Sequence, residues 1–405
     1  MNFLQSKSGR AWTFGVLYFT EGAPIGFVWW AMPAFLRLRN LPIEQITTLT
    51  AFLVLPWTLK FLWAPAIDVL RNDRWTYKSW ILLMQFLMGA ALAPLLVIDP
   101  ETQFETAALL LFLHAMAAST QDAAIDALAI ATVPANERGR INGWMQIGML
   151  TGRSILGGGS LMLIGWFGFH AIVASLAGLL WLSAGLLWIF VQEPIVESRR
   201  VSPATFLTSI KRMSFQRSSI LGLLFAIIGG CAFEGVGSVA GPFLVDLHFS
   251  GETVGMFFAA PVIIAMAAGA AFGGWWTDKK GTFSSLRMSL LGIAGLVLLL
   301  ALGVLLDWGP EVEAVLLICL YAAIGLFTAG SYAMFMQLTD RRFGATQFSA
   351  FMGATNACEF WATAAMGRGV AHVGYGVSFV AAGLVSLFGL PILSMLQNTR
   401  DRSTE

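Results

Sequence analysis

Charged side chains in the middle of long apolar stretches are the residues of this sequence that most require a chemical explanation. Five lie roughly 14–24 Å from one end of their stretch, at about 1.5 Å of helix per residue: Glu21, Asp122, Arg153, Glu234 and Glu359. An ionisable group in hydrocarbon is costly, so each is a functional candidate. A carboxyl group shielded from water can load and release a proton near neutral pH, and the surplus of acid over Arg153 favours a proton carrier. The alternative is structural, with an acid and Arg153 neutralising each other and fixing a helix register.

Other charged residues lie nearer the ends of these stretches and suggest a gate. Asp122 and Asp126 are four residues apart, so one face of a helix carries both. Asp126 is nearer the basic end and is a candidate partner for Arg138 or Arg140 in an inner gate. Lys60 is a second gate candidate, although a lysine whose head reaches out of the membrane is an equal alternative.

The composition requires a membrane. Of 405 residues, 57% are hydrophobic and 12% are charged, whereas soluble domains have about 25% charged residues. Lipid must therefore cover most of the surface. A net charge of +1 argues against a nucleic-acid partner. The three cysteines lack the spacing of a metal site or disulfide framework. With no nucleophile elbow or His-rich site either, we predict no metal, no cofactor and no enzymatic activity.

Twelve apolar stretches are long enough to cross a bilayer as helices, which takes about 20 residues each. Turn and charge signals separate them, and short turns containing Gly or His divide the fifth from the sixth and the eleventh from the twelfth. The predicted spans are 12–36, 43–67, 78–98, 105–132, 139–165, 169–191, 218–245, 251–276, 284–306, 313–337, 345–371 and 374–397.

Basic residues alternate between the loops in a way that sets the orientation. With the N-terminus inside, 19 of the 24 Lys and Arg fall on the cytoplasmic side, and only Arg37 and Arg39 fall outside. Cytoplasmic loops carry the excess of basic residues in membrane proteins. We therefore expect a multi-pass membrane protein with both termini in the cytoplasm.

The longest polar stretch, 192–217, divides the chain into related halves. We interpret it as a cytoplasmic linker between an N-terminal six-helix bundle, 1–191, and a C-terminal six-helix bundle, 218–405. The halves share short matches: Met32-Pro33-Ala34-Phe35 resembles Gly241-Pro242-Phe243, and Thr20-Glu21-Gly22 resembles Phe233-Glu234-Gly235. These matches indicate two parallel repeats, with a substrate site expected at mid-membrane between them.

Several loop and helix motifs resemble the major facilitator superfamily. The stretch from Gly274 to Gly281, with Asp278 and Lys279 inside it, is similar to a cytoplasmic loop pattern of that superfamily. The resemblance implies an all-α membrane protein with the major facilitator fold, twelve transmembrane helices in two six-helix halves. In that plan, spans 1, 4, 7 and 10 line the cavity.

Four further stretches resemble the peptide–acetyl-CoA–drug transporter branch, which includes AmpG-like muropeptide permeases and siderophore importers. The resemblance implies importance for Lys60, Asp68, Gln121, Asp122 and Asp126. Where the muropeptide members carry a basic residue in span eleven this chain has Glu359, and its short length is closer to the siderophore members. The stretches are Leu59–Asp68, Ser119–Ala127, Glu137-Arg138-Gly139 with Ile147–Leu150, and Ala345–Phe348.

We therefore expect a secondary active transporter that couples protons to the import of an organic solute, muropeptide-like or otherwise of medium size and polar. Its partners would be a small-molecule substrate, protons and membrane lipid, with the protein as a monomer. Import of a siderophore is the alternative within the family. Efflux of a drug or solute, and a membrane sensor that transports nothing, remain open.

Overall fold

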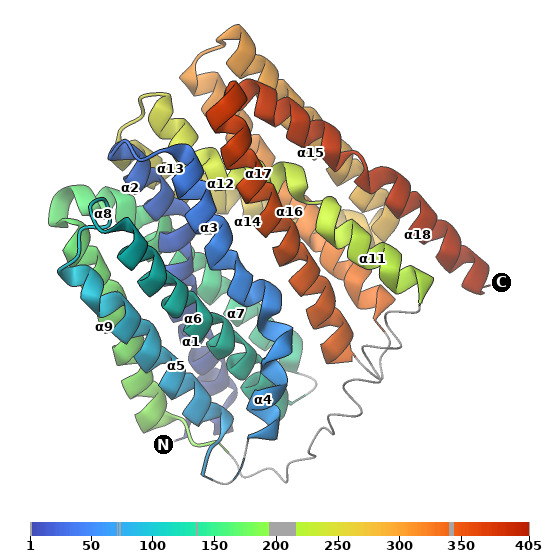
Figure 1. The fold of residues 1–405 in the computed structure, drawn as a ribbon. Helices are drawn as coiled ribbons and strands as arrows, with labels where there is room; N and C mark the ends of the chain where they lie inside the picture. The colour runs from blue at the N-terminus through green and yellow to red at the C-terminus, as the bar shows by residue number, and fades with distance from the viewer. Residues whose placement is uncertain are drawn as a thin grey trace. The chain divides into compact units, whose positions relative to one another are not determined.

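The computed structural model describes residues 2–70, 72, 74–134, 137–193, 216–339 and 344–404. Within these ranges every regular element is a helix (Figure 1), so the predicted all-α membrane fold is confirmed. The physical reason is that hydrocarbon offers backbone groups no water, so each apolar stretch satisfies its own hydrogen bonds by coiling.

Backbone contacts divide the chain into two compact units. Unit 1 comprises Met1–Arg39, Leu62–Val201 and Ser250–Ala259, and unit 2 comprises Asn40–Phe61, Ser202–Phe249 and Ala260–Glu405. This division follows packing, whereas the predicted halves follow an internal repeat, so the halves remain a prediction. Most of the predicted linker, residues 194–215, lies outside the described residues.

Unit 1 contains the helices of the first half of the chain except α3, together with α13. Its elements are η1 (Phe3–Gln5), α1 (Lys7–Gly26), η2 (Phe27–Ala31), α2 (Met32–Leu38), α4 (Ala64–Val69), α5 (Tyr77–Leu92), η4 (Ala93–Leu96), α6 (Phe104–Thr132), α7 (Arg138–Gly152), η6 (Arg153–Gly158), α8 (Gly159–Phe167), α9 (Phe169–Phe190) and α13 (Gly251–Ala259).

Unit 2 contains α3, which packs along α17, and the remaining helices of the second half. The short helix η3 (Lys60–Leu62) straddles the division between the units. The elements of unit 2 are α3 (Ile43–Leu59), α11 (Arg217–Ile228), α12 (Cys231–Asp246), α14 (Pro261–Lys280), α15 (Thr282–Leu306), α16 (Pro310–Leu338), α17 (Gly344–Ser386) and α18 (Gly389–Thr404).

Ten helical segments among the described residues are long and apolar enough to cross a membrane. One of them, Phe348–Thr399, holds two predicted spans, because Gly374 has a φ of 78° and breaks the helix there. The first predicted span corresponds to α1, η2 and α2, and it is not among the ten segments. The architecture is therefore consistent with twelve crossings. Gly168, with a φ of 82°, ends α8 at the other predicted short turn.

Several spans contain breaks that the sequence analysis did not predict. Two segments, Phe27–Ala31 in the first span and Arg153–Gly158 in the fifth, are π-helical. The eighth span breaks between α13 and α14 at Ala260, where φ is −130° and ψ is −64°. Pro261 follows and has no N–H to continue the helix. Apolar periodicity reports burial and length, so it does not reveal such local changes of helical pitch.

Glycines allow the closest helix contacts in both units. In unit 1, a Cβ on Gly148 of α7 would overlap the carbonyl oxygen of Gly15 in α1. In unit 2, a Cβ on Gly269 of α14 would overlap the carbonyl oxygen of Ala322 in α16. Small residues at such points let backbones approach without a hydrophobic driving force. The fifth and eighth spans meet at Gly158, where a Cβ would lie 2.7 Å from the Phe258 side chain.

Candidate functional site

Four polar side chains of α1 and α6 form the unit 1 acidic cluster: Tyr18, Glu21, Asp122 and Asp126. The Tyr18 hydroxyl donates a hydrogen bond of 2.7 Å to Asp126 Oδ1. The charges of Asp122 and Glu21 also act on that hydroxyl. Glu21 is only 1% exposed. The structure thus brings three of the predicted acids together around a tyrosine.

Helical spacing explains how the sequence builds this cluster. Tyr18 and Glu21 are three residues apart in α1, and Asp122 and Asp126 are four apart in α6, so each pair shares one helix face. Tyr18 was not among the predicted site residues. Its spacing from Glu21 was the available signal, since a tyrosine one turn from a buried acid is a natural hydrogen-bond donor to a carboxylate.

Arg153 belongs to the same unit and begins the π-helical segment η6. Its backbone packs against α1, because a Cβ on Gly26 would lie 2.7 Å from Arg153 Cα. Arg153 is half-buried. The hydroxyl of the next residue, Ser154, donates to the carbonyl oxygen of Ala259 at the end of α13. Arg153 therefore lies beside α1, about one and a half turns beyond Glu21.

Unit 2 holds Glu234 of α12 and Glu359 of α17, the unit 2 acidic pair. The charge of Glu234 acts on the Tyr321 hydroxyl and on the thiols of Cys231 and Cys358, and the charge of Glu359 acts on Cys358. The two cysteines belong to one buried hydrophobic cluster. Both glutamates are half-buried. The prediction that these acids and those of unit 1 face one cavity stays a prediction.

The predicted gate residues are spread over several elements. Lys60 is half-buried in η3, while Asp278 and Lys279 are exposed at the end of α14. Lys279 Nζ lies 4.8 Å from the centre of the Trp275 ring. The backbones of Asp68 and Arg138 lie in α4 and α7, but their side chains are outside the described part of the structure. A pairing of Asp126 with Arg138 or Arg140 therefore remains a prediction.

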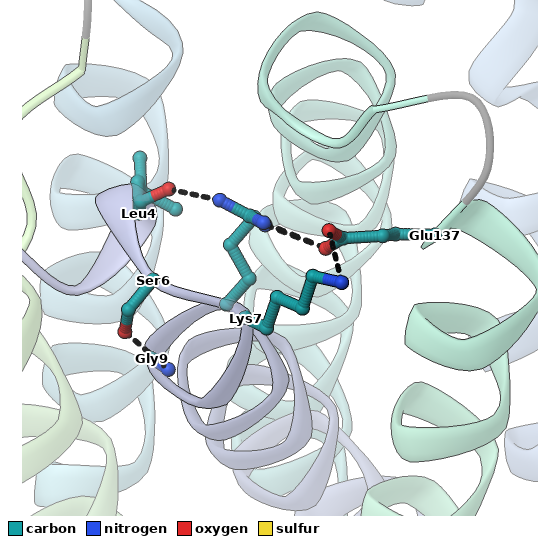
Figure 2. A network of polar contacts seen from close by, with 6 residues as sticks. Leu4, Ser6, Lys7, Gly9 and Glu137 are labelled. Carbon is teal, nitrogen blue, oxygen red and sulfur yellow. Dashed lines mark hydrogen bonds and ion pairs between the residues drawn. The ribbon is translucent and has the colours of Figure 1, made fainter.

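An ion-pair network that the sequence analysis missed ties α1 to the segment before α7 (Figure 2). Arg10 donates to Glu137 Oε2 through Nη2 at 2.6 Å and through Nε at 3.1 Å, and Nη1 donates to the Leu4 carbonyl at 2.8 Å. Lys7 Nζ lies 3.9 Å from Glu137 Oε1. The Arg10 side chain is only 9% exposed, so the pair is largely shielded from water.

Within the described ranges, no group of three or more His, Cys, Asp or Glu side chains is arranged to hold a metal ion.

Comparison with known proteins identifies this arrangement of helices. The family model described as Major Facilitator Superfamily matches residues 14–367. The chain belongs to the major facilitator superfamily. It is a multi-pass membrane transporter of a small-molecule substrate and not an enzyme, which confirms those predictions at this level.

Relatives and solved structures agree with the membership. A Rickettsia conorii protein named transporter AmpG 4 is 25% identical, over 97% of this chain and 98% of its own length. The anhydromuropeptide permease of Escherichia coli K12 is 22% identical, over 95% of this chain and 79% of the permease. The predicted resemblance to AmpG-like transporters is therefore confirmed.

Two crystal structures show the shared fold. The structure of the nucleoside transporter NupG aligns with a TM-score of 0.75 at 14% identity, over 96% of this chain and 98% of NupG. The D-xylose–proton symporter aligns with a TM-score of 0.71 at 14% identity, over 94% and 98% of the two chains. At these identities the likeness concerns the fold alone.

Proposed function

We propose that this transporter couples protons to the import of an organic solute across the bacterial inner membrane. The observation that carries the proposal is Glu21, a carboxyl group 1% exposed within the first span and grouped with Tyr18, Asp122 and Asp126. Acidic side chains within a membrane are costly, and they commonly serve proton transfer.

Protonation changes the energy of such a cluster in a defined direction. Neighbouring carboxylates repel one another, and burial penalises each charge, so one bound proton stabilises the cluster. A solute that binds the protonated protein more tightly promotes proton binding by the same factor. Loading of both on the periplasmic side, followed by deprotonation on the cytoplasmic side, would drive net import. Glu234 and Glu359 are the other candidate carriers.

The relatives support a muropeptide-like substrate. The Escherichia coli relative is named an anhydromuropeptide permease, and we extend that substrate class to this chain as a proposal. Import of a siderophore is the alternative, motivated by Glu359 at a position that is basic in muropeptide members. The distribution of basic residues supports a cytoplasmic location for both termini. We also propose that the protein is a monomer.

Uptake into proteoliposomes tests the proposal. With an acidic exterior, the wild-type protein should accumulate radiolabelled anhydromuropeptide, and a protonophore should abolish the accumulation. Glu21→Gln should lose accumulation while retaining exchange of labelled for unlabelled solute, because exchange needs no net proton movement. If Glu21→Gln, Glu234→Gln and Glu359→Gln all keep full pH-dependent uptake, the coupling proposal is wrong. A labelled ferric siderophore in the same assay separates the two substrate classes.

A further inference from the structure

Buried polar side chains from three helices meet inside unit 1. The Thr20 hydroxyl of α1 donates to the Leu17 carbonyl at 2.9 Å and lies 3.4 Å from Ser183 Oγ of α9. Gln85 Nε2 of α5 donates to the same Ser183 oxygen at 3.0 Å. Thr20 and Gln85 are fully buried, and Ser183 is 3% exposed. A hydroxyl and an amide thus converge on one serine in the core of the bundle.

Two glutamines in this region have polar atoms left over. Gln85 Oε1 and both amide atoms of Gln121, in α6, have no hydrogen-bond partner among the described residues. Gln121 is also fully buried. Buried amide groups in native proteins are almost always paired, and ordered water supplies the partner when protein does not. Two acceptors and one donor without a protein partner indicate a place for water.

The register of α5 against α6 sets how far apart the two glutamines lie along the helix axes. His114 Nδ1 lies 3.1 Å from the Met88 carbonyl, which fixes the register of these two helices. The helices run antiparallel because a short loop joins them. Gln85 precedes Met88 by three residues and Gln121 follows His114 by seven. The two glutamines are therefore offset by about four residues, or about 6 Å along the helix axis.

That separation matches what a water site needs. Two glutamine side chains offset by one turn can both reach a water molecule between them, and a buried water makes about three hydrogen bonds. Gln85 Oε1 and Gln121 Oε1 would accept, and Gln121 Nε2 would donate. A second water would fit the same polar set. Thr20 directly precedes Glu21, and Gln121 directly precedes Asp122, so the region lies at the same level of α1 and α6 as the unit 1 acidic cluster.

We propose that the interior of unit 1 contains a water-binding site formed by Gln85 and Gln121, and that this water relays protons to the unit 1 acidic cluster. The relay rests on the proposed proton coupling, whereas the water site does not. The transfer balances: a proton passes along the water, one water O–H bond breaks as another forms, and the proton ends on a carboxylate oxygen. Glu21, at 1% exposure, needs such a route because bulk water does not reach it.

Substitution by leucine distinguishes water-bound glutamines from ones that truly lack partners. If no water is present, Gln121→Leu removes unsatisfied atoms in favour of an apolar group of similar size, and the protein should become more stable. If water is bound, Gln121→Leu should instead lower the melting temperature of the purified protein, because both amide atoms of Gln121 then lose their partner. Gln146→Leu, at an exposed position of α7, is the matched control and should leave it unchanged.

A high-resolution cryo-EM or crystal structure tests the site directly. Water density within hydrogen-bond distance of both Gln85 Oε1 and Gln121 is expected, and it should vanish in Gln121→Leu. An empty interior in the wild type, or a gain of stability in Gln121→Leu, would overturn the water site.

Uptake assays test the relay separately. Gln121→Leu should slow proton-driven accumulation while leaving solute exchange intact, and unchanged accumulation would overturn the relay. If the wild-type protein shows no pH-dependent uptake, the proposed function and the relay both fail, while water density still decides the site.

Discussion

The two units of this transporter carry their buried acids in different surroundings. In unit 1, Glu21 is almost fully buried, and its charge acts on the Tyr18 hydroxyl together with the charges of Asp122 and Asp126. In unit 2, Glu234 and Glu359 are half-buried and act on thiols and on Tyr321. Glu21 and Glu234 occupy matching places in the predicted repeats, so matched positions do not imply matched chemistry. The polar setting of unit 1 suits proton exchange, and the thiol-lined setting of unit 2 suits it less.

The largest effect should come from a feature that both units have, close packing at glycine. Gly148→Leu and Gly269→Leu should each prevent stable folding, because the new side chain would overlap a backbone carbonyl that cannot move aside; overpacking alone often costs about 1–3 kcal/mol. Size-exclusion chromatography in detergent would measure the loss. Gly143→Leu in α7 and Gly274→Leu in α14 are controls, since a Cβ there meets nothing within 4 Å. Monodisperse, thermally stable Gly148→Leu protein would refute this packing.

The ion pairs of the two units should differ in how much each stabilises the protein. Glu137→Gln in unit 1 leaves the shielded Arg10 guanidinium without its carboxylate and should cost about 3 kcal/mol of stability. Glu44→Gln in unit 2 removes a partner of Arg368, but at 3.8 Å, with those side chains 46% and 72% exposed, the cost should stay below about 1 kcal/mol. Thermal unfolding of both purified variants measures the difference. Equal shifts would show that the Arg10 pair is no better shielded than the Arg368 pair.

A tyrosine substitution tests the polar character of the unit 1 acidic cluster. Tyr18→Phe removes the hydrogen bond to Asp126 and should reduce proton-driven uptake by roughly tenfold, the effect of about 1.4 kcal/mol. Tyr375→Phe removes a similar bond of 2.8 Å to Asp246 in unit 2 and should leave uptake near the wild-type value. The initial rate of accumulation at acidic external pH is the measurement. A larger defect in Tyr375→Phe would reverse the assignment of roles.

The smallest effect should come from the thiols of unit 2. Cys231→Ser and Cys358→Ser should retain most of the uptake activity, because the cysteines act as small apolar packing groups there. In the native protein, a maleimide should leave the two buried thiols, Cys231 and Cys358, unmodified. Mass spectrometry of the labelled protein checks this. Rapid labelling of Cys358 would mean that the surroundings of the unit 2 acidic pair open to water.

Some parts of this picture could be predicted from the sequence, and others could not. The spans, their glycine turns at Gly168 and Gly374, and the candidate acids follow from hydropathy and from the cost of charge in lipid. Tyr18 and Glu137 were missed as site residues for a physical reason. Their importance depends on partners more than 100 residues away, and no local spacing records which helices pack together.

The same limit applies to the helix breaks and to the packing groups. A sequence pattern predicts that residues 12–36 or 251–276 cross the membrane, but it does not show a π-helical segment or the break before Pro261. It also does not show that α3 packs with α17, or that Gln85 and Gln121 keep atoms without protein partners. These features arise from tertiary packing, which selects one local backbone solution among several of similar energy.

The central claim is that the acids of unit 1, and Glu21 first among them, carry the transported proton. Proton exchange on substrate binding tests it most directly, measured with a pH-indicating dye in weakly buffered solution of the purified protein. Adding substrate to the wild type should draw protons from solution, because binding favours the protonated state. Glu21→Gln should abolish the signal and Glu234→Gln should retain it. A full signal from Glu21→Gln together with its loss in Glu234→Gln would contradict the account.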